Sequence, residues 1–337
     1  KVVIVGAGPG GLTAGMILAH RGFDVEIFEK DSVVGGRNQP IKIDGYTFDT
    51  GPTFLMMNFV LEEMFEETGR TASDYLDFRK LDPMYRLIFH NKSILMTSDH
   101  KKMKEEIEKV FPGEGEGFET FLKNEKKRFN YLFPCLQKPY DSFTDMMKNP
   151  LLKAIPHLDL DKSVHRVLSG YFKDELLKLC FTFQSKYLGM SAWECPAAFA
   201  MIAYIEHKWG IYHTIGGLNA ISLAMAKVVE EEGGKIRLNT KVKKIINEGK
   251  KATGVELENG EIIKADDVVV NADFSYAVTE LMDKKYVKKY APSKLAERKY
   301  SCSIFMLYLG VDKKYDIPHH NVFFAEKYRQ NVDDIFK

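Results

Sequence analysis

The 337-residue sequence has few cysteines, and they are far apart. The four, Cys135, Cys180, Cys195 and Cys302, include no C-x-x-C pair. Structural zinc sites and disulfide frameworks need cysteines at closer and more regular spacing. We therefore expect neither a metal site nor a disulfide framework, and this cysteine usage is typical of a protein in a reducing cytoplasm.

The sequence also lacks an excess of charge of either sign. Its 48 lysine and arginine residues nearly balance its 47 aspartate and glutamate residues. A balanced chain has no global field that would attract a polyanion. We therefore expect no nucleic acid partner, and any electrostatic attraction would come from local patches.

Long apolar runs are missing as well. The longest strongly apolar stretch, around Pro196–Ile205, is well short of the roughly 20 residues that span a bilayer. No charged leader with an apolar core and cleavage site is present at the start, because a short apolar segment begins at Val2 and runs into glycines. We expect no transmembrane helix, and the length and composition favour a soluble globular protein of about two domains.

The first thirty residues have the pattern of a complete β-turn-α-β unit. Val2–Val5 is a short apolar run, typical of a strand that is buried on both faces. Gly6, Gly8 and Gly11 follow with G-x-G-x-x-G spacing, and a helix is predicted from about Gly10 to Arg21. In such a unit the first glycine permits a tight turn, the second lets the backbone approach a pyrophosphate, and the third lets helix and strand pack closely.

A second strand, Asp24–Phe28, is predicted to end at Glu29, eighteen residues after Gly11. A carboxylate at this place can accept hydrogen bonds from both hydroxyls of a ribose, and it disfavours a 2′-phosphate. The amino end of the preceding helix would present unpaired amides and a positive dipole end to the pyrophosphate. Together these elements predict a dinucleotide site in a doubly wound α/β domain.

The residues after Glu29 indicate which dinucleotide binds. Gly35-Gly36-Arg37 combines two glycines, which allow close approach of the backbone, with a guanidinium that supplies charge and donors. A second bend follows at Gly51-Pro52. With the preceding unit, the triplet resembles the FAD-binding start of the amine-oxidase-like flavoproteins. Within that superfamily, the segment Asp44–Thr53 resembles the bacterial-type phytoene desaturase family of carotenoid biosynthesis.

The resemblance extends from Val2 to Phe336 and is most specific in His319–Phe336. The sequence departs from the family pattern in Tyr212–Leu218. This stretch lacks the proline that is usual before the paired glycines, and it ends in leucine where methionine is frequent. The family also has a C-terminal glycine-rich segment that closes over the flavin; it would follow Phe336, so we expect that this FAD-closing segment is absent from the sequence.

The motif and the resemblance together imply FAD as the cofactor. In the family, Val242 would meet the adenine through its backbone, and the remaining residues surround the dinucleotide. The expected cofactor-binding residues are Gly6, Gly8, Pro9, Gly10, Gly11, Glu29, Lys30, Gly36, Arg37, Gly51, Pro52, Thr53, Val242 and Asp273.

The fold implied is α/β, an FAD-type Rossmann (doubly wound) domain with an inserted, mostly helical substrate domain that also carries antiparallel strands. We expect the discontinuous Rossmann domain to comprise residues 1–58 and 206–280. The substrate domain, which would face a membrane, would comprise residues 59–205 and 281–337.

Periodicity predicts further elements along the chain. In the second part of the Rossmann domain we predict a helix at Asn219–Glu232, a strand at Lys235–Leu238, a three-stranded meander over residues 242–263 and a strand at Asp267–Asn271. Ser301–Gly310 also has the pattern of a strand.

In the inserted region, residues 85–97 predict a hairpin. Phe118, Phe121, Leu122, Phe129 and Leu132 recur at helical intervals, which favours core positions over a substrate tunnel.

Two further features of the sequence bear on substrates and ligands. Tyr187–Ile211, with Trp193 and Trp209, fits a lipid-sized cavity and a buried helix equally well. The pair His319-His320 has no third ligand at a useful spacing, so we expect no metal site there.

The resemblance implies an enzyme, an FAD-dependent oxidoreductase that desaturates long isoprenoid polyenes such as phytoene or dehydrosqualene. FAD would accept a hydride from an allylic carbon. A polyene cis–trans isomerase that uses reduced FAD, another amine-oxidase-like flavoprotein, and a truncated non-catalytic flavin- or lipid-binding chain are the alternatives. The sequence assigns no catalytic acid or base. Arg37 and His213 are candidates only because of where they lie in the sequence relative to the expected site.

A hydrophobic polyene substrate without a spanning segment indicates a cytoplasmic protein that associates peripherally with a membrane surface. The apolar region Trp193–Trp209 is the expected contact. The sequence does not indicate an oligomeric state.

Overall fold

The computed structural model describes residues 1–147 and 150–336, and it divides into two compact units. Unit 1 comprises Lys1–Arg79 and Tyr212–Lys299, and unit 2 comprises Lys80–Ile211 and Tyr300–Lys337. The chain thus leaves unit 1 later than residue 58, where we expected the first boundary. The physical reason is the helix after residue 58, which buries Leu61 in the core of unit 1.

Unit 1 is built around a sheet of four parallel strands in the order β10-β2-β1-β14. These strands are β1 (Val2–Val5), β2 (Val25–Phe28), β10 (Lys235–Arg237) and β14 (Asp267–Val270). Every residue of β1 and β2 is buried, as expected for strands that are covered on both faces. The doubly wound core is therefore assembled from two parts of the chain that lie far apart in sequence.

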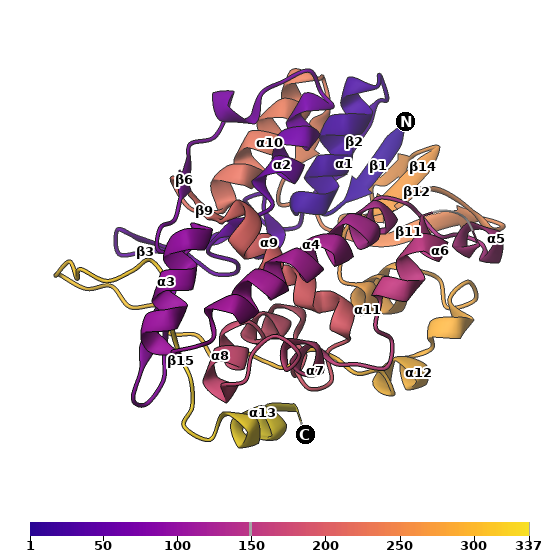
Figure 1. Cartoon of the computed structure of the whole chain (residues 1–337). Helices are drawn as coiled ribbons and strands as arrows, with labels where there is room; N and C mark the ends of the chain where they lie inside the picture. The colour runs from indigo at the N-terminus through magenta and orange to yellow at the C-terminus, as the bar shows by residue number, and fades with distance from the viewer. Residues whose placement is uncertain (148–149, 337) are drawn as a thin grey trace. The chain divides into compact units, whose positions relative to one another are not determined.

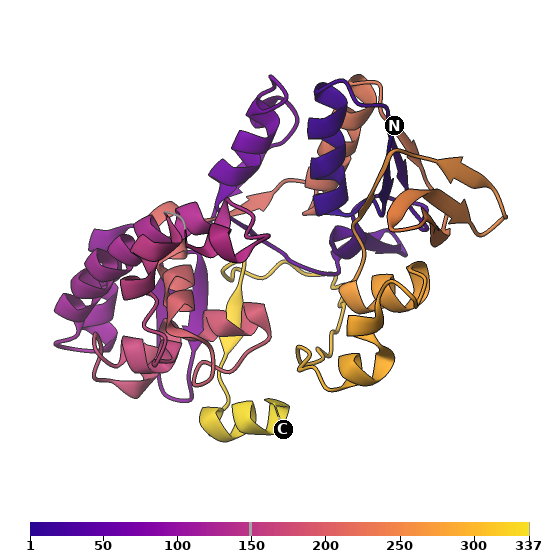
Figure 2. The same cartoon turned by 90° about the vertical axis from the view of Figure 1, so that its right-hand side faces the viewer.

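The two faces of this sheet have different covers, and β1 alternates between them. Val2 and Ile4 pack in one cluster with the helices α1 (Pro9–His20) and α10 (Asn219–Glu231). Val3 and Val5 pack in the other cluster, with the antiparallel meander β11-β12-β13. Figure 1 shows α1 and α10 beside the strands, and Figure 2 shows the meander on the other side. The meander consists of β11 (Val242–Glu248), β12 (Lys251–Leu257) and β13 (Ile262–Lys264).

The remaining elements of unit 1 are short. They are η1 (Gly36–Asn38), β3 (Pro40–Ile43), β4 (Tyr46–Asp49), β5 (Leu55–Met56), α2 (Asn58–Glu66), η2 (Ala72–Asp74), β6 (Phe78–Lys80), β9 (Ile211–Thr214), α11 (Phe274–Tyr276), η6 (Ala277–Leu281), η7 (Lys288–Tyr290) and α12 (Pro292–Ala296). β3 and β4 form a hairpin, and the order β5-β9-β6 describes a third small sheet.

Unit 2 is mostly helical and has one three-stranded sheet in the order β15-β7-β8. Its elements are β7 (Tyr85–Ile88), β8 (Ser93–Met96), α3 (His100–Val110), α4 (Gly115–Leu136), α5 (Phe143–Met146), α6 (Leu151–Ala154), η3 (Ile155–His157), α7 (Val164–Leu168), α8 (Glu175–Cys180), η4 (Phe183–Leu188), η5 (Ala197–Ala200), α9 (Met201–Trp209), β15 (Asn321–Phe323) and α13 (Tyr328–Phe336). The hairpin expected over residues 85–97 is confirmed by the antiparallel pair β7 and β8.

The core of unit 2 is aromatic. Phe118 and Phe121 on α4 are fully buried and lie against Phe172 and Phe181, with ring centroids 4.8 to 6.3 Å apart. Such offset and edge-on pairs add to the stabilisation that burial of the rings supplies. The helical spacing of phenylalanines in α4 is therefore the signature of a packed core, as the sequence favoured.

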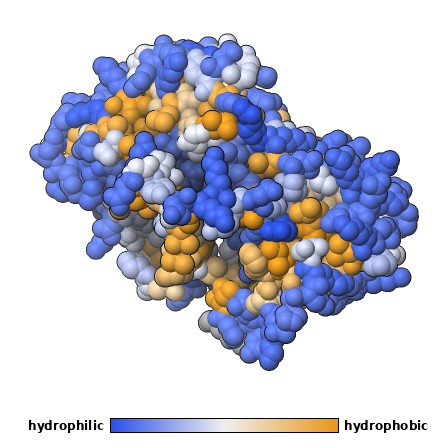
Figure 3. All heavy atoms as spheres, turned by 90° about the vertical axis from the view of Figure 1, so that its left-hand side faces the viewer, coloured by the Kyte–Doolittle hydropathy of each residue, from blue (hydrophilic) through white to orange (hydrophobic). Residues whose placement is uncertain are grey.

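The strand predicted at Ser301–Gly310 is wrong. Residues 301–310 have no regular secondary structure, and Ile304 and Phe305 are 78% and 88% exposed. An apolar β-type pattern makes a strand only where a neighbouring strand completes its hydrogen bonds, and in the described part of the chain no strand pairs with this stretch. Figure 3 shows hydrophobic side chains at the surface among hydrophilic ones.

The sequence left two interpretations for Tyr187–Ile211, the lining of a lipid-sized cavity and a buried helix, and α9 lies in this stretch. Ala203, Tyr204 and Ile205 are all at most 5% exposed, as the buried-helix interpretation expects, and the role of Tyr187–Ile211 in a lipid-sized cavity stays a prediction. None of the helices in residues 1–147 and 150–336 combines the length and the apolar character that a membrane span needs.

Candidate functional site

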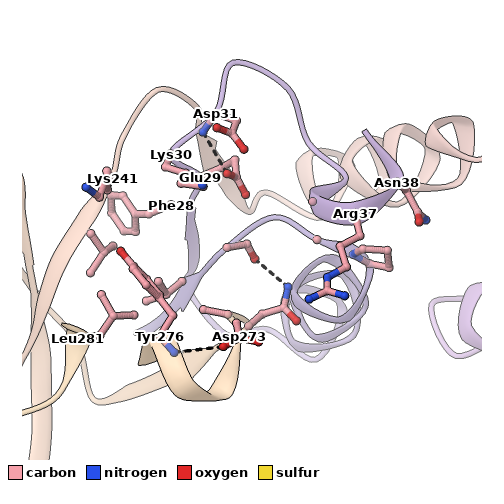
Figure 4. A pocket seen from close by; sticks show the side chains of 18 residues that line it. Phe28, Glu29, Lys30, Asp31, Arg37, Asn38, Lys241, Asp273, Tyr276 and Leu281 are labelled. Carbon is pink, nitrogen blue, oxygen red and sulfur yellow. Dashed lines mark hydrogen bonds between the residues drawn. The ribbon is translucent and has the colours of Figure 1, made fainter. Parts of the chain in front are cut away.

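A cavity of about 850 Å³ lies in unit 1, at the carboxyl ends of the parallel strands. This is the edge at which open α/β sheets bind their ligands. Figure 4 shows its side chains. The lining residues are Val5, Gly6, Gly8, Pro9, Phe28, Glu29, Lys30, Asp31, Gly36, Arg37, Asn38, Lys241, Val242, Asn271, Ala272, Asp273, Tyr276 and Leu281.

The glycine turn between β1 and α1 forms one wall of the cavity. Gly6 has φ +97°, a conformation that side chains disfavour, so the turn needs glycine there. A Cβ at Gly11 would lie 2.1 Å from the Gly6 carbonyl oxygen, which is too close for any side chain. A Cβ at Gly36 would lie 3.3 Å from the Gly8 Cα, so the second glycine-rich turn approaches the first closely. The roles that the spacing assigned to these glycines therefore have a steric basis.

Glu29 stands at the end of β2 and is 5% exposed. Its Oε2 accepts a hydrogen bond from the Ala7 amide at 2.8 Å, and its Oε1 accepts one from the Asp31 amide at 3.0 Å. Each carboxylate oxygen has a further lone pair that can accept a hydrogen bond. The carboxylate therefore ties β2 to the glycine turn and keeps acceptor capacity for a ribose hydroxyl.

Arg37 lines the cavity from η1, next to the first glycine turn. The bend at Gly51 passes directly against it, because a Cβ at Gly51 would lie 2.1 Å from the Arg37 carbonyl oxygen. Pro52 and Thr53 follow this bend, and the Thr53 carbonyl oxygen lies 3.3 Å from Nδ1 of His213. The second bend thus supports the arginine turn from outside the cavity.

The charged residues of the lining are of both signs. Three acids, Glu29, Asp31 and Asp273, and three bases, Lys30, Arg37 and Lys241, reach the cavity (Figure 4). Cations can neutralise the phosphates of a dinucleotide, and acids can bind sugar hydroxyls. Phe28, Val242, Tyr276 and Leu281 supply apolar surface against which a flat ring can pack.

Asn271 is the main residue that sequence reasoning missed. It directly follows β14, and its Nδ2 lies 3.4 Å from the Gly6 carbonyl oxygen. The signal was available, since a polar residue after an apolar strand next to β1 must lie at the same sheet edge as the glycine turn. The other lining residues that were missed are Val5, Phe28, Asp31, Asn38, Lys241, Ala272, Tyr276 and Leu281.

The structure brings nine of the fourteen expected cofactor residues to the cavity, namely Gly6, Gly8, Pro9, Glu29, Lys30, Gly36, Arg37, Val242 and Asp273. Gly10, Gly11, Gly51, Pro52 and Thr53 are not part of the lining. Gly10 and Gly11 belong to the first turn of α1, and the other three form the supporting bend. Contacts of all fourteen with a cofactor stay predictions. Within residues 1–147 and 150–336, no three His, Cys, Asp or Glu side chains are grouped so as to hold a metal ion.

Residues 9–328 match the flavin containing amine oxidoreductase family. The chain belongs to this family. Its membership confirms the expected flavin cofactor, FAD, and the resemblance on which the oxidoreductase assignment rested. The site described above fits such a dinucleotide, because a glycine turn without room for side chains faces the cavity beside a buried acid at the end of β2.

Curated relatives narrow the similarity to carotenoid desaturases. The chain is 51% identical over 335 residues to the 4,4′-diapophytoene desaturase (4,4′-diapolycopene-forming) of Methylomonas sp, covering 99% of this chain and 66% of that protein. It is 37% identical over 340 residues to the zeta-carotene-forming phytoene desaturase of Myxococcus xanthus, covering 100% of this chain and 65% of that protein. The chain thus spans about two thirds of the length of these relatives.

Solved structures of other proteins share the fold. An oxidoreductase from Methanosarcina mazei aligns with a TM-score of 0.56 and 20% identity, over 86% of this chain and 64% of that one. A putrescine oxidase variant aligns with a TM-score of 0.56 and 17% identity, over 86% of this chain and 62% of that one. The expected α/β fold class, with its Rossmann-like parallel sheet and helical region, is confirmed.

Proposed function

We propose that the protein is an FAD-dependent desaturase of long isoprenoid polyenes such as phytoene or 4,4′-diapophytoene, acting in carotenoid biosynthesis. The observation that carries the proposal is the 51% identity to a 4,4′-diapophytoene desaturase across 99% of this chain. Identity at this level over a whole shared region makes a similar reaction the best-supported one. When FAD is bound, it would serve as the acceptor of a hydride from an allylic carbon of the substrate.

The chain's own residues have defined parts in holding the cofactor. We assign the pyrophosphate to the turn Gly6–Gly11, where the amino end of α1 favours negative charge. Glu29 is assigned to the adenosine ribose, and Val242 is assigned to the adenine. Arg37 and Lys30, which line the cavity, would balance the phosphate charge. No residue is assigned as a catalytic acid or base.

We also propose that the protein works in peripheral contact with a membrane. The support is the hydrophobic character of the proposed polyenes, which partition into lipid, together with the lack of a spanning helix in the described residues. A protein of this kind must collect its substrate at the lipid surface. Most residues of α9, at the end of the expected contact Trp193–Trp209, are buried, which favours a contact surface elsewhere on the molecule.

The purified full-length protein should be tested without oxygen, with phytoene or 4,4′-diapophytoene supplied in liposomes. Desaturation predicts that oxidised flavin is bleached, that the product loses two hydrogens for each new double bond, and that its absorption shifts to the red. The Glu29→Ala variant, with weakened cofactor binding, is the matched control and should bleach less flavin at equal protein concentration.

Three other outcomes would each overturn the proposal in favour of a named alternative. Turnover that needs pre-reduced flavin and gives products of unchanged mass would indicate a polyene cis–trans isomerase. Bleaching by amines but not by polyenes would indicate an amine oxidase. Polyene binding with no change of the flavin spectrum would indicate a non-catalytic binding chain.

A further inference from the structure

Positive charge is concentrated in one short stretch of unit 1, residues 283–299, which we call the basic segment. It has six lysines and one arginine against Asp283 and Glu297, a net charge of +5. The whole chain has a net charge of +1, so the other residues together carry −4. The balanced composition therefore conceals a strongly basic patch. Its cations are Lys284, Lys285, Lys288, Lys289, Lys294, Arg298 and Lys299.

The charge of the basic segment is exposed and poorly neutralised. All seven cationic residues are exposed. Lys285 pairs with Asp283 at 3.1 Å, and in the described part of the chain no other ion pair involves the segment. Lysines of the nearby meander behave differently, since Lys241 and Lys243 each pair with a glutamate. Uncompensated cations on one surface produce a local positive field that an anionic partner can use.

Aromatic rings accompany these cations. The guanidinium of Arg298 lies 5.5 Å from the ring of Tyr290 and 5.7 Å from the ring of Phe274. These two rings meet edge to face at 4.9 Å. Phe274 is nevertheless 48% exposed, and Tyr286, which lies under the ammonium of Lys285, is 38% exposed. Lysine and arginine beside half-exposed aromatic rings is the composition of a surface that sits at lipid headgroups.

The basic segment is joined directly to the candidate site. It begins two residues after Leu281, the last residue of η6, which lines the cavity. Tyr276 of α11 lines the same cavity, and Phe274 of α11 belongs to the aromatic group. The segment belongs to unit 1, and Leu295 of α12 is its one buried residue. Figure 1 labels α11, which precedes the basic segment, and α12, which lies within it.

We propose that the basic segment, with Phe274 and Tyr286, docks the protein on the anionic headgroups of a phospholipid bilayer. This inference names the surface and the lipid charge for the membrane contact proposed above, and so it rests on that proposal. Each basic residue near an anionic membrane raises the partition coefficient about fivefold. Several such residues bind reversibly without a spanning helix, and the aromatic rings add interfacial contacts.

Sedimentation with vesicles of phosphatidylcholine alone, and of phosphatidylcholine mixed with phosphatidylglycerol, tests this surface in the full-length protein. We expect binding to the mixed vesicles that weakens as salt is raised. A variant with Lys284, Lys285, Lys288 and Lys289 replaced by glutamine should bind these vesicles at least about tenfold more weakly. The matched control replaces Lys101, Lys123, Lys126 and Lys127, four exposed lysines of unit 2, by glutamine and should bind like the unaltered protein.

The other outcomes separate the parts of the inference. If the basic-segment variant binds as well as the control, this surface is not the contact, although membrane association stands. If no vesicle binds the unaltered folded protein, membrane association falls with it, while desaturation in detergent still decides the proposed reaction. Tighter binding to a single-stranded oligonucleotide than to anionic vesicles, lost in the same variant, would overturn the lipid assignment in favour of nucleic acid.

Discussion

The side chain of Asn271 reaches the carbonyl oxygen of Gly6 at 3.4 Å, although 265 positions separate the two residues. They meet because β14 pairs with β1 in parallel, with Val270 opposite Val5, so both strands end at one edge of the sheet. The same side chain fills the space beside the glycines of α1. A late part of the chain therefore fixes the turn at its beginning.

This contact predicts that two neighbouring glycines respond differently to alanine. A Cβ at Gly10 would lie 2.8 Å from the Asn271 side-chain Oδ1, whereas a Cβ at Gly11 would lie 2.1 Å from a backbone oxygen, that of Gly6. Gly10→Ala should lower the free energy of unfolding by about 1–3 kcal/mol, as overpacking does. Gly11→Ala should lower the free energy of unfolding more, because the Gly6 carbonyl group belongs to the backbone and cannot rotate away from the new methyl group as a side chain can. Urea unfolding measures both.

The double variant Gly10→Ala with Asn271→Ala is the control for this explanation. Removal of the asparagine side chain takes away the atom that the new methyl group meets, so the pair should be less destabilising than the sum of the single changes. Gly11→Ala should gain much less from Asn271→Ala. Equal effects of the two glycine substitutions would show that the clash with Asn271 does not govern this turn.

Much of the nucleotide half could be predicted from the sequence because its signals are local. β1 matches the apolar run Val2–Val5, and α10, predicted at Asn219–Glu232, spans Asn219–Glu231. The strand predicted at Ser301–Gly310 failed because a strand needs a partner, and the pattern of one segment does not contain its partner. The place of Asn271 after an apolar strand was visible in the sequence, but its contact with Gly6 depends on the register of β14 against β1, which the sequence of one strand does not contain.

Glu29 is expected to have two roles, which substitution can separate. Glu29→Ala removes the acceptor proposed for the ribose and also leaves the buried Ala7 amide without its 2.8 Å partner. Loss of charge-assisted hydrogen bonds costs about 1.5–3 kcal/mol, so FAD affinity should fall roughly tenfold to a hundredfold. Titration of the apoprotein with FAD, followed by flavin fluorescence, measures this change.

Glu29→Gln is the informative comparison. Its amide oxygen can still accept from the Ala7 amide, but its NH2 group cannot accept from the Asp31 amide, so folding should be less affected than in Glu29→Ala while FAD binding is weakened by the lost charge. If Glu29→Ala destabilises the fold but leaves FAD affinity unchanged, the carboxylate is a structural tie between β2 and the glycine turn and does not bind the ribose.

The aromatic core of unit 2 predicts a stability effect rather than a change of substrate. Phe121→Ala removes a fully buried ring that contacts Phe118, Phe172 and Phe181. Its cost should be about 3–5 kcal/mol of the free energy of unfolding, the usual range for buried phenylalanine. The next residue, Leu122, is only partly buried, so Leu122→Ala should cost clearly less. A stable Phe121→Ala variant with an altered product pattern would instead support a substrate tunnel.

One buried carboxyl group in unit 2 has no cationic partner among residues 1–147 and 150–336. Glu206 on α9 is fully buried, and it accepts hydrogen bonds from the Tyr85 hydroxyl at 2.7 Å and from the Gln184 amide at 2.9 Å. Burial raises the pKa of Glu206 to about 7, although these hydrogen bonds act in the opposite direction. Gln184 Oε1 is buried without a hydrogen-bond partner, so after rotation of the amide it can accept a hydrogen bond from the O–H of the protonated Glu206.

The raised pKa of Glu206 predicts how stability depends on pH. The carboxyl pKa is about 7 in the folded chain against 4.5 as its ordinary value, so the folded chain holds the proton more tightly. The stability from this proton is complete below about pH 4.5 and is lost as the pH rises through about 7. The full span corresponds to about 3 kcal/mol of the free energy of unfolding. Urea unfolding of the unaltered protein between these pH values should follow this decline, whereas Glu206→Gln, which has no titrating proton, should flatten it. An unchanged slope in Glu206→Gln would show that Glu206 does not titrate in this range.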